Sequence, residues 1–264
     1  MSRLKLVTSD YFPEYRNRQR LDLEKLFSKI ESVTKTPELS HTSFLLASIS
    51  SSNIEGNPVD INSYMRYVES GKKLKSKSIL EIECLINAYE FAKYSRLTFE
   101  NLLQAYKIFA IALGINKKDV GALRTGEVGV YRIQPGEMPE KIYSSAPKEI
   151  LHDEMKKLFS DIGALNKRSL SIDETFYFAS FLHLVFVKIH PFADGNGRAG
   201  RLLEKWFLAH HLGANAWHIR SEMYYWKNIR SYYSRLKIGK TYETIDYKKC
   251  LPFLLLLPNA LKLK

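Results

Sequence analysis

Apolar and polar residues along this chain alternate mainly with the period of an α-helix. Apolar residues recur at three- and four-residue steps, as in the stripe that runs from Ile79 to Tyr89. Each such stripe predicts a helix with one face packed in a core. The helices predicted in this way cover Leu21–Ser32, Ser43–Ile54, Ile61–Glu69, Ile79–Ala92, Phe99–Leu113, Glu149–Phe159, Glu174–Ile189, Gly197–His211, Tyr224–Leu236 and Ile245–Leu257. The predicted fold class is therefore mainly α.

One stretch, from Thr125 to Tyr143, departs from this helical period. It mixes β-branched and aromatic residues with glycine and proline, a composition typical of strands joined by turns. The positions that indicate an irregular β-hairpin are Val128, Val130, Ile133, the turn Gln134-Pro135-Gly136, Ile142 and Tyr143. Because a lone hairpin is unstable in water, we expect it to lie as a flap on a single helical body.

The composition is ordinary for a soluble globular protein except in its charge. The chain has 264 residues, of which 45% are hydrophobic, and a formal net charge of +12. Such a charge indicates a nucleic acid, an anionic surface or a polyanionic ligand such as a nucleotide. The lysines are scattered apart from a cluster at 71–77, which we interpret as a loop. We therefore favour a solvated basic face with a phosphate site over a nucleic-acid surface.

Cysteine content and hydropathy predict a cytoplasmic location. Cys84 and Cys250 are too few for a disulfide framework and fit no zinc spacing. The first twelve residues lack the apolar run of a signal peptide. The longest apolar run, Phe253–Leu257, lies between two prolines and is too short to span a bilayer. We expect no membrane association.

The segment His190–Arg201, HPFADGNGRAGR, separates two apolar helices and carries most of the polar chemistry. The turn Gly195-Asn196-Gly197 ends the first helix and lets the second begin, with its backbone N–H groups pointing outward. Free N–H groups and the positive end of the helix dipole form an anion site, which glycine leaves open to phosphate. This segment therefore predicts a phosphate-binding loop.

Four side chains in this segment complete the parts needed for phosphoryl transfer. Arg198 and Arg201 are three residues apart, so both can bind a polyphosphate from one helix face. Asp194 is a hard oxygen ligand placed to hold Mg²⁺ on phosphate oxygens. His190 can act as a general base near neutral pH. Each residue alone is better explained as a cap, a turn or a solvent-facing charge, and only their joint occurrence favours a nucleotide site. Gly239-Lys240-Thr241 is no P-loop, because Ser234 stands where the first glycine is required.

HPFADGNGRAGR resembles the Fic-family motif H-x-F-x-[DE]-G-N-G-R-x-x-R at every specified position. The resemblance implies the Fic fold, a helical bundle with one hairpin flap, and transfer of AMP from Mg²⁺-ATP to a Tyr, Ser or Thr hydroxyl of a target protein. It implies His190 as the base, Phe192 as the loop's core anchor and Asp194 as the Mg²⁺ ligand. The phosphates would be bound by Gly195, Asn196, Gly197, Arg198 and Arg201. Doc relatives, which phosphorylate, carry lysine in place of the second glycine, so Gly197 favours adenylylation.

A second segment, Ser51–Asn57 (SSNIEGN), resembles the inhibitory motif [ST]-x-x-x-E-[GN] of the same family. Read alone, Glu55 at a predicted helix end beside Gly56 is an ordinary solvent-exposed carboxylate. The resemblance implies that Ser51 and Glu55 share a helix face and that Glu55 pairs with Arg201, in place of the ATP γ-phosphate. The position of the motif before the loop implies the autoinhibited intramolecular class.

The resemblance extends over about 51–236 and implies how the whole chain is divided into regions. GALRTGEVGVYRI followed by IYSSAP resembles the family's flap, so we expect the target protein to bind along about 125–145. NIRSYYSRL resembles the adenine-side helix, which implies that Tyr232 or Tyr233 contacts the base. The predicted regions are 1–95 with the inhibitory motif, 96–211 as the core, and a helical extension at 212–264 that completes the nucleotide site.

Three functions remain open at this point. The first is an adenylyltransferase restrained by Glu55, which could also modify itself. The second is removal of AMP from a modified protein, with Glu55 positioning a water. The third is a non-catalytic basic module that binds nucleic acid or a partner; the intact loop argues against it. The sequence does not fix the target, the modified residue type or the oligomeric state.

Overall fold

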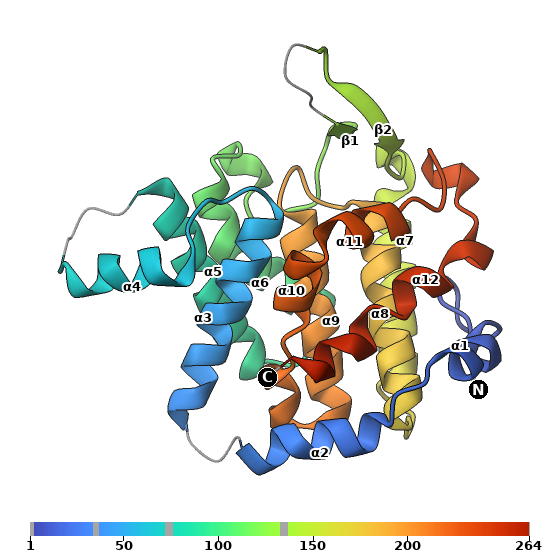
Figure 1. Ribbon diagram of the computed structural model, residues 1–264. Coiled ribbons are helices and arrows are strands. Elements are labelled where there is room, and N and C mark those ends of the chain that lie inside the picture. Colours follow the sequence, from blue (N-terminus) through green and yellow to red (C-terminus); the bar gives the residue numbers. More distant parts are fainter. Residues whose placement is uncertain (1–2, 34–36, 72–75, 133–136, 264) are drawn as a thin grey trace.

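The computed structural model describes residues 3–33, 37–71, 76–132 and 137–263. At its centre are two helices, α8 (Ile172–Ile189) and α9 (Asn196–Leu212), which lie side by side (Figure 1). Most residues of both helices are buried, so each is surrounded by other elements on nearly every side. The predicted loop joins these two helices, and the fold therefore holds it from both ends.

The N-terminal half supplies helices on both sides of this pair (Figure 1). They are α1 (Phe12–Arg18), α2 (Leu23–Val33), α3 (Pro37–Ile54), α4 (Ile61–Glu69), α5 (Lys77–Lys93) and α6 (Phe99–Ala110). Side chains of Asp60, Ser76 and Thr98 cap α4, α5 and α6 by accepting a backbone N–H, which fixes where these helices begin. The helix α3 packs against α5 and α10, and its C-terminal end approaches α9.

The predicted flap is present as a two-stranded antiparallel hairpin of β1 (Gly129–Arg132) and β2 (Glu140–Ser144). It projects from the helical body (Figure 1), and a register irregularity lies between Val130 and Tyr131. Ser144 also forms a bridge to Thr241, which ties the base of β2 to the C-terminal region. Ile133 and the predicted turn at 134–136 lie outside the described residues, as does part of the predicted loop at 71–77.

The C-terminal half contributes α7 (Lys148–Leu165), α10 (Ser221–Lys227), α11 (Ile229–Arg235) and α12 (Leu251–Leu254). Short 3₁₀ helices lie at Ile111–Leu113, Lys117–Asp119, Ala214–His218, Tyr242–Thr244, Tyr247–Lys249 and Leu257–Lys262. Among the described residues, no helix is both long and apolar enough to cross a bilayer.

Two of the predicted helices are interrupted in the structure, two others extend six residues further than predicted (to Leu165 in α7, and from Pro37 in α3), and the α-helix α1 was missed. A continuous helix over Ile245–Leu257 does not form, because Pro252 and Pro258 fit only the first turns of the short helices that they begin. The helix predicted over Tyr224–Leu236 is broken at Asn228. The short helix α1 carries only one buried residue, so it has no apolar stripe to detect.

Candidate functional site

The loop begins where α8 ends, at His190. This residue closes the helix in the left-handed conformation, with φ 57° and ψ 61°, and its N–H donates to the Phe186 carbonyl. Within the described ranges it is the one residue other than glycine with a positive φ. Such backbone strain persists only where the surroundings impose it, and it is concentrated at functional sites.

Phe192 and Asn196 impose the shape of the loop. The Phe192 ring is fully buried and stacks on Tyr106, with ring centroids 3.6 Å apart. The Asn196 side chain closes the loop on itself, because its amide donates to the Phe192 carbonyl and accepts the Phe192 N–H, each at 2.8 Å. Phe192 is therefore the core anchor that the motif predicted, and the Asn196 side chain helps to hold the loop closed.

Gly195 and Gly197 keep the start of α9 open. Gly195 has φ +82°, and a Cβ there would meet Leu113 and Phe109 at less than 3 Å. A Cβ on Gly197 would lie 2.1 Å from a carboxylate oxygen of Glu55. The first N–H groups of a helix have no carbonyl partner within it, so they attract an anion. The carboxylate of Glu55 lies at this helix N-terminus.

His190 has the geometry of a base. Its Nδ1 lies 3.2 Å from the Val187 carbonyl, which can only accept, so the hydrogen is on Nδ1 and Nε2 keeps its lone pair. Burial lowers the pKa of His190, and the nearby charge of Arg124 acts in the same direction. The opposing contact with Val187 and the charges of Glu55 and Asp194 do not reverse this shift. The imidazole is therefore neutral at pH 7 and able to accept a proton.

Glu55 and Arg201 form an ion pair, as the second motif predicted. Arg201 Nη2 lies 2.7 Å from Glu55 Oε1, and the Arg201 side chain is fully buried whereas 27% of the Glu55 side chain is exposed. Arg201 also donates from Nε to the Ser51 hydroxyl at 2.8 Å and from Nη2 to the Ser51 carbonyl at 3.0 Å. Burial would raise the pKa of Glu55, but Arg201 and Arg198 together outweigh it and lower that pKa.

Arg198 has a partner that sequence reasoning missed. Its guanidinium lies 2.8–2.9 Å from one carboxylate oxygen of Glu81 on α5, and 7% of its side chain is exposed. Both arginines of the motif are thus paired with carboxylates from other helices. Binding of phosphate by Arg198 remains a prediction, and it requires the free side of a guanidinium that Glu81 already holds.

Tyr232 and Tyr233 both reach the site but differ in exposure. Tyr232 is 1% exposed, and its hydroxyl accepts from Arg201 Nη1 at 3.2 Å. Tyr233 is 40% exposed and donates its hydroxyl to the Ile54 carbonyl, next to Glu55. Tyr232 is thus committed to Arg201 through its hydroxyl, and Tyr233 presents the more open ring.

A pocket of about 520 Å³ lies between the loop, the flap and α11, and it brings together some of these groups but not Arg198 or Arg201. Its lining comprises Glu55, Val130, Tyr131, Arg132, Ile142, Tyr143, Val187, Lys188, His190, Gly197, Tyr232, Tyr233, Leu236, Lys237 and Gly239. Lys188 forms part of the floor below the flap, with its Nζ 4.1 Å from the centre of the Tyr143 ring, and burial lowers its pKa to about 8. The pocket therefore combines a base, a helix N-terminus and a flap edge.

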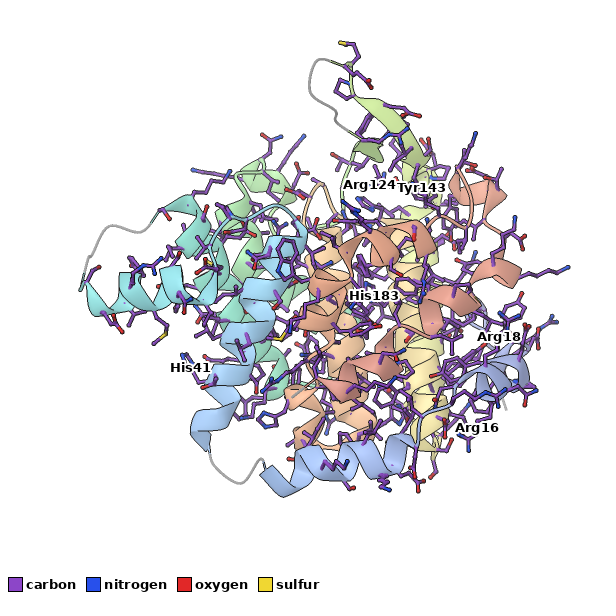
Figure 2. All side chains as sticks on the ribbon, viewed as in Figure 1. Arg16, Arg18, His41, Arg124, Tyr143 and His183 are labelled. Atoms are coloured by element: carbon purple, nitrogen blue, oxygen red, sulfur yellow. The ribbon has the colours of Figure 1, made fainter. Side chains whose placement is uncertain are left out.

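Arg124 joins the flap to the loop and was not predicted. Figure 2 shows it beside Tyr143 at the base of the hairpin. Its guanidinium donates to the His190 carbonyl at 2.8 Å, to Gly126, and to Ser145 and Ala146 at the end of β2. The backbone N–H of Arg124 donates to the Pro191 carbonyl at 3.0 Å. The strained turn at His190 is thereby fixed to the flap.

Asp194 is exposed, and one of its carboxylate oxygens accepts the Gly195 N–H at 2.5 Å. A single carboxylate beside a phosphate-binding helix N-terminus suits Mg²⁺, which proteins commonly bind through one or two carboxylates together with substrate phosphates. The donor set is thus compatible with a metal that arrives with a nucleotide.

Comparison with known proteins agrees with this geometry. The family model Fic/DOC matches residues 97–208. The chain is 30% identical over 153 residues to "Protein adenylyltransferase Fic" of Nematostella vectensis, across 58% of this chain and 34% of that protein. It is 25% identical over 192 residues to "Protein adenylyltransferase fic-1" of Caenorhabditis elegans, across 69% of this chain and 35% of that protein. The chain thus spans about a third of the length of these relatives.

Solved structures share the fold at lower sequence identity. A Fic family protein from Desulfovibrio desulfuricans superposes with a TM-score of 0.73 at 20% identity, covering 99% of this chain and 76% of that one. A Fic domain containing signaling protein from Bacteroides thetaiotaomicron gives 0.63 at 21% identity, covering 92% and 98%. The fold is therefore the Fic fold, and within it residues 97–208 match the Fic/DOC family model.

Proposed function

We propose that this protein is an adenylyltransferase that transfers AMP from ATP to a hydroxyl side chain of a target protein. The observation that carries the proposal is the shared pocket, in which the unprotonated Nε2 of His190 faces the same space as the N-terminus of α9 at Gly197. The names of the curated relatives support the same activity. This shared pocket supports a reaction in which His190 assists attack on a nucleotide bound at the start of α9.

In the proposed reaction, His190 takes the proton of the target hydroxyl as its oxygen forms a bond to the α-phosphorus. The bond from that phosphorus to the bridging oxygen of the β-phosphate breaks, and pyrophosphate leaves. In this reaction the backbone N–H groups at the start of α9 and the guanidinium of Arg201 would hold the phosphates. Asp194 would hold Mg²⁺, which supplies positive charge to the phosphate oxygens when bound. The pKa of His190 lies below its usual value, so it is ready to accept a proton at neutral pH.

Glu55 would restrain this reaction. Its carboxylate lies at the start of α9 and accepts a hydrogen bond from Arg201, so it occupies the place that a terminal phosphate would need. Removal of this carboxylate should free one donor of Arg201 and the space above Gly197. A charge-assisted hydrogen bond is worth about 1.5–3 kcal/mol, so we expect about a 10- to 150-fold gain in kcat/KM for the freed enzyme.

The flap would hold the target. An extended segment can add to the edge of a two-stranded hairpin through backbone hydrogen bonds, without a sequence requirement beyond the side chains it presents. Val130, Tyr131 and Arg132 of β1 line the pocket, so a segment beside them would lie near His190. The target hydroxyl would then enter between flap and loop.

Incubation of Glu55→Gly with a cell lysate and ATP tests the proposal. We expect label from the α-phosphate, and none from the γ-phosphate, to enter protein, with little incorporation by the unsubstituted chain. His190→Ala added to Glu55→Gly should abolish labelling, whereas His210→Ala, at the exposed end of α9, should leave it unchanged. Equal labelling with and without His190 would refute the role of the base, and γ-label alone would indicate phosphorylation.

A second candidate, hydrolysis of AMP from a modified protein, uses the same pocket. Glu55 Oε1 is bonded to Arg201, and in the part of the chain that the structure describes no partner is recorded for Oε2. That oxygen could orient a water toward a bound AMP-protein. Release of AMP by the unsubstituted chain, lost in Glu55→Gly, would favour this activity. Release unaffected by that change would exclude Glu55 as the residue that orients the water, and no release by the unsubstituted chain would exclude the activity.

A further inference from the structure

A chain of buried polar side chains runs behind Arg201, outside the inhibitory and loop motifs. It passes from Arg201 to Tyr232 on α11, then to His183 on α8, and ends at Glu204 on α9. The side chains of His183 and Glu204 are fully buried, and Tyr232 is 1% exposed. Figure 2 places His183 in the middle of the helical body.

The direction of every hydrogen bond in this chain follows from its ends. A guanidinium can only donate, so the Tyr232 oxygen accepts from Arg201 Nη1 at 3.2 Å. The Tyr232 hydroxyl hydrogen then goes to His183 Nε2 at 3.1 Å. His183 therefore carries its hydrogen on Nδ1 and donates it to Glu204 Oε2 at 2.8 Å. All three bonds point from the cation to the carboxylate.

The opposite tautomer is unfavourable. A hydrogen on His183 Nε2 would give the Tyr232 oxygen two N–H donors and leave its own hydroxyl without an acceptor. A Cβ on Gly200 would lie 2.9 Å from the His183 ring, so α8 and α9 approach closely at this point, which fixes the ring.

The contacts of Arg201 divide into two groups that come from different parts of the fold. Ser51 and Glu55 both belong to the α3 end that carries the inhibitory motif. Tyr232 is the one recorded side-chain partner of Arg201, in the described residues, that lies elsewhere. If the α3 end withdraws, the first group weakens as a whole and the second remains.

We propose that His183 and Glu204 are positioning residues, which through Tyr232 keep Arg201 in place for the nucleotide triphosphate once Glu55 withdraws. This inference rests on the proposed function for the identity of the ligand, but not for the behaviour of Arg201. Glu204 also accepts the Tyr225 hydroxyl at 2.9–3.0 Å, so its charge is stabilised at the far end. A buried guanidinium would otherwise lose its ordered acceptors at the moment it must bind phosphate.

The first test measures Arg201 directly, without nucleotide, in the Glu55→Gly protein. Nitrogen-15 NMR should show His183 protonated on Nδ1 and slowly exchanging guanidinium N–H signals for Arg201. His183→Phe, which keeps the ring, should speed that exchange about tenfold, the amount expected when one hydrogen-bonded chain is lost. Unchanged exchange, or a His183 hydrogen on Nε2, would overturn the proposal. If His183→Phe does not fold, the tautomer of His183 in the Glu55→Gly protein decides the question: a hydrogen on Nδ1 supports the proposal, and a hydrogen on Nε2 overturns it.

The second test measures ATP in the same background. His183→Phe should raise the KM for ATP about tenfold with kcat within about twofold, because ground-state and transition-state binding of the phosphates fall together. Glu204→Gln should stay within about threefold, since its amide oxygen can still accept from Nδ1. The control His210→Ala, at the exposed end of α9, should stay within about twofold. An unchanged KM in His183→Phe would contradict the proposal. Slow Arg201 exchange with no nucleotide binding by Glu55→Gly would instead disprove the proposed function and leave the positioning intact.

Discussion

A methyl group added to Gly197 should act through Glu55. The ideal Cβ at this position lies 2.1 Å from Glu55 Oε1 and 3.1 Å from Arg201 Nη1. Contact between a carbon and an oxygen becomes favourable only near about 3.5 Å, so the carboxylate must retreat by more than an ångström. That retreat breaks the 2.7 Å bond to Arg201. Gly197→Ala should therefore have the same effect on stability as loss of the hydrogen bond between Glu55 and Arg201.

The expected magnitude follows from two opposing effects. Loss of a charge-assisted hydrogen bond costs about 1.5–3 kcal/mol. Alanine in place of glycine in a helix stabilises by about 0.5–1 kcal/mol. In the unsubstituted chain, Gly197→Ala should lower the free energy of unfolding by about 1–2 kcal/mol. In the Glu55→Gly background only the helix term remains, offset by the tight contact with Arg201, so the change should lie within about 0.5 kcal/mol of zero.

Urea unfolding of the unsubstituted chain, Gly197→Ala, Glu55→Gly and the double variant measures the coupling between Gly197 and Glu55. We expect an interaction free energy of about 1–2 kcal/mol between the two positions. Gly163→Ala on α7 is the matched control: a Cβ there meets nothing within 4 Å, so it should stabilise both backgrounds equally. Coupling below about 0.5 kcal/mol would refute the placement of Glu55 over the start of α9. Gly197→Ala should not activate the enzyme, because its methyl remains where phosphate would approach.

Three further predictions concern the loop and its supports. In Glu55→Gly, kcat/KM should fall only in acid, with an inflection below pH ~6.5 in a pH–rate profile. The reason is that the pKa of His190 is lowered and the enzyme needs the neutral imidazole. An inflection above pH ~6.5 would contradict the assignment of His190 as the base. Glu81→Gln should lower the free energy of unfolding by about 1–3 kcal/mol in urea, since Arg198 loses its carboxylate, and a change under about 0.5 kcal/mol would show that the pair is dispensable. Arg124→Lys cannot reproduce the guanidinium fork and should reduce kcat about tenfold with a smaller effect on the KM for ATP, whereas unchanged kcat would mean that the turn at His190 holds without it.

The helices could be predicted wherever packing follows a simple stripe. The bounds of α4 agree with the prediction at both ends, because Asp60 caps its start and its apolar face is regular. The prediction failed at Ile245–Leu257, where leucines suggested a helix and the two prolines decided otherwise. Local chain chemistry overrode the hydrophobic period there.

The site residues that are contiguous in the sequence could be predicted from it, and those that packing brings together from distant segments could not. His190, Gly197 and Arg201 stand within one twelve-residue segment, so their spacing carried the chemistry. Glu81 and Arg124 come from distant segments, where each looks like an ordinary surface charge. One signal was available for Glu204: a carboxylate within the apolar run LLEKWFL is expensive to bury and implies a specific partner.

The burial of Arg201 explains why its two sets of partners come from different elements. A fully buried guanidinium whose partners all came from one segment would lose every acceptor if that segment withdrew, and the protein would then resist opening. In the proposed function Glu55, whose side chain is the more exposed of the pair, would exchange with an anionic ligand while Tyr232, hydrogen-bonded to His183, keeps its bond to the same cation. The cost of releasing the carboxylate would then be limited to one ion pair, which an incoming phosphate would replace. On this proposal one segment closes the site and another holds it in shape for the ligand.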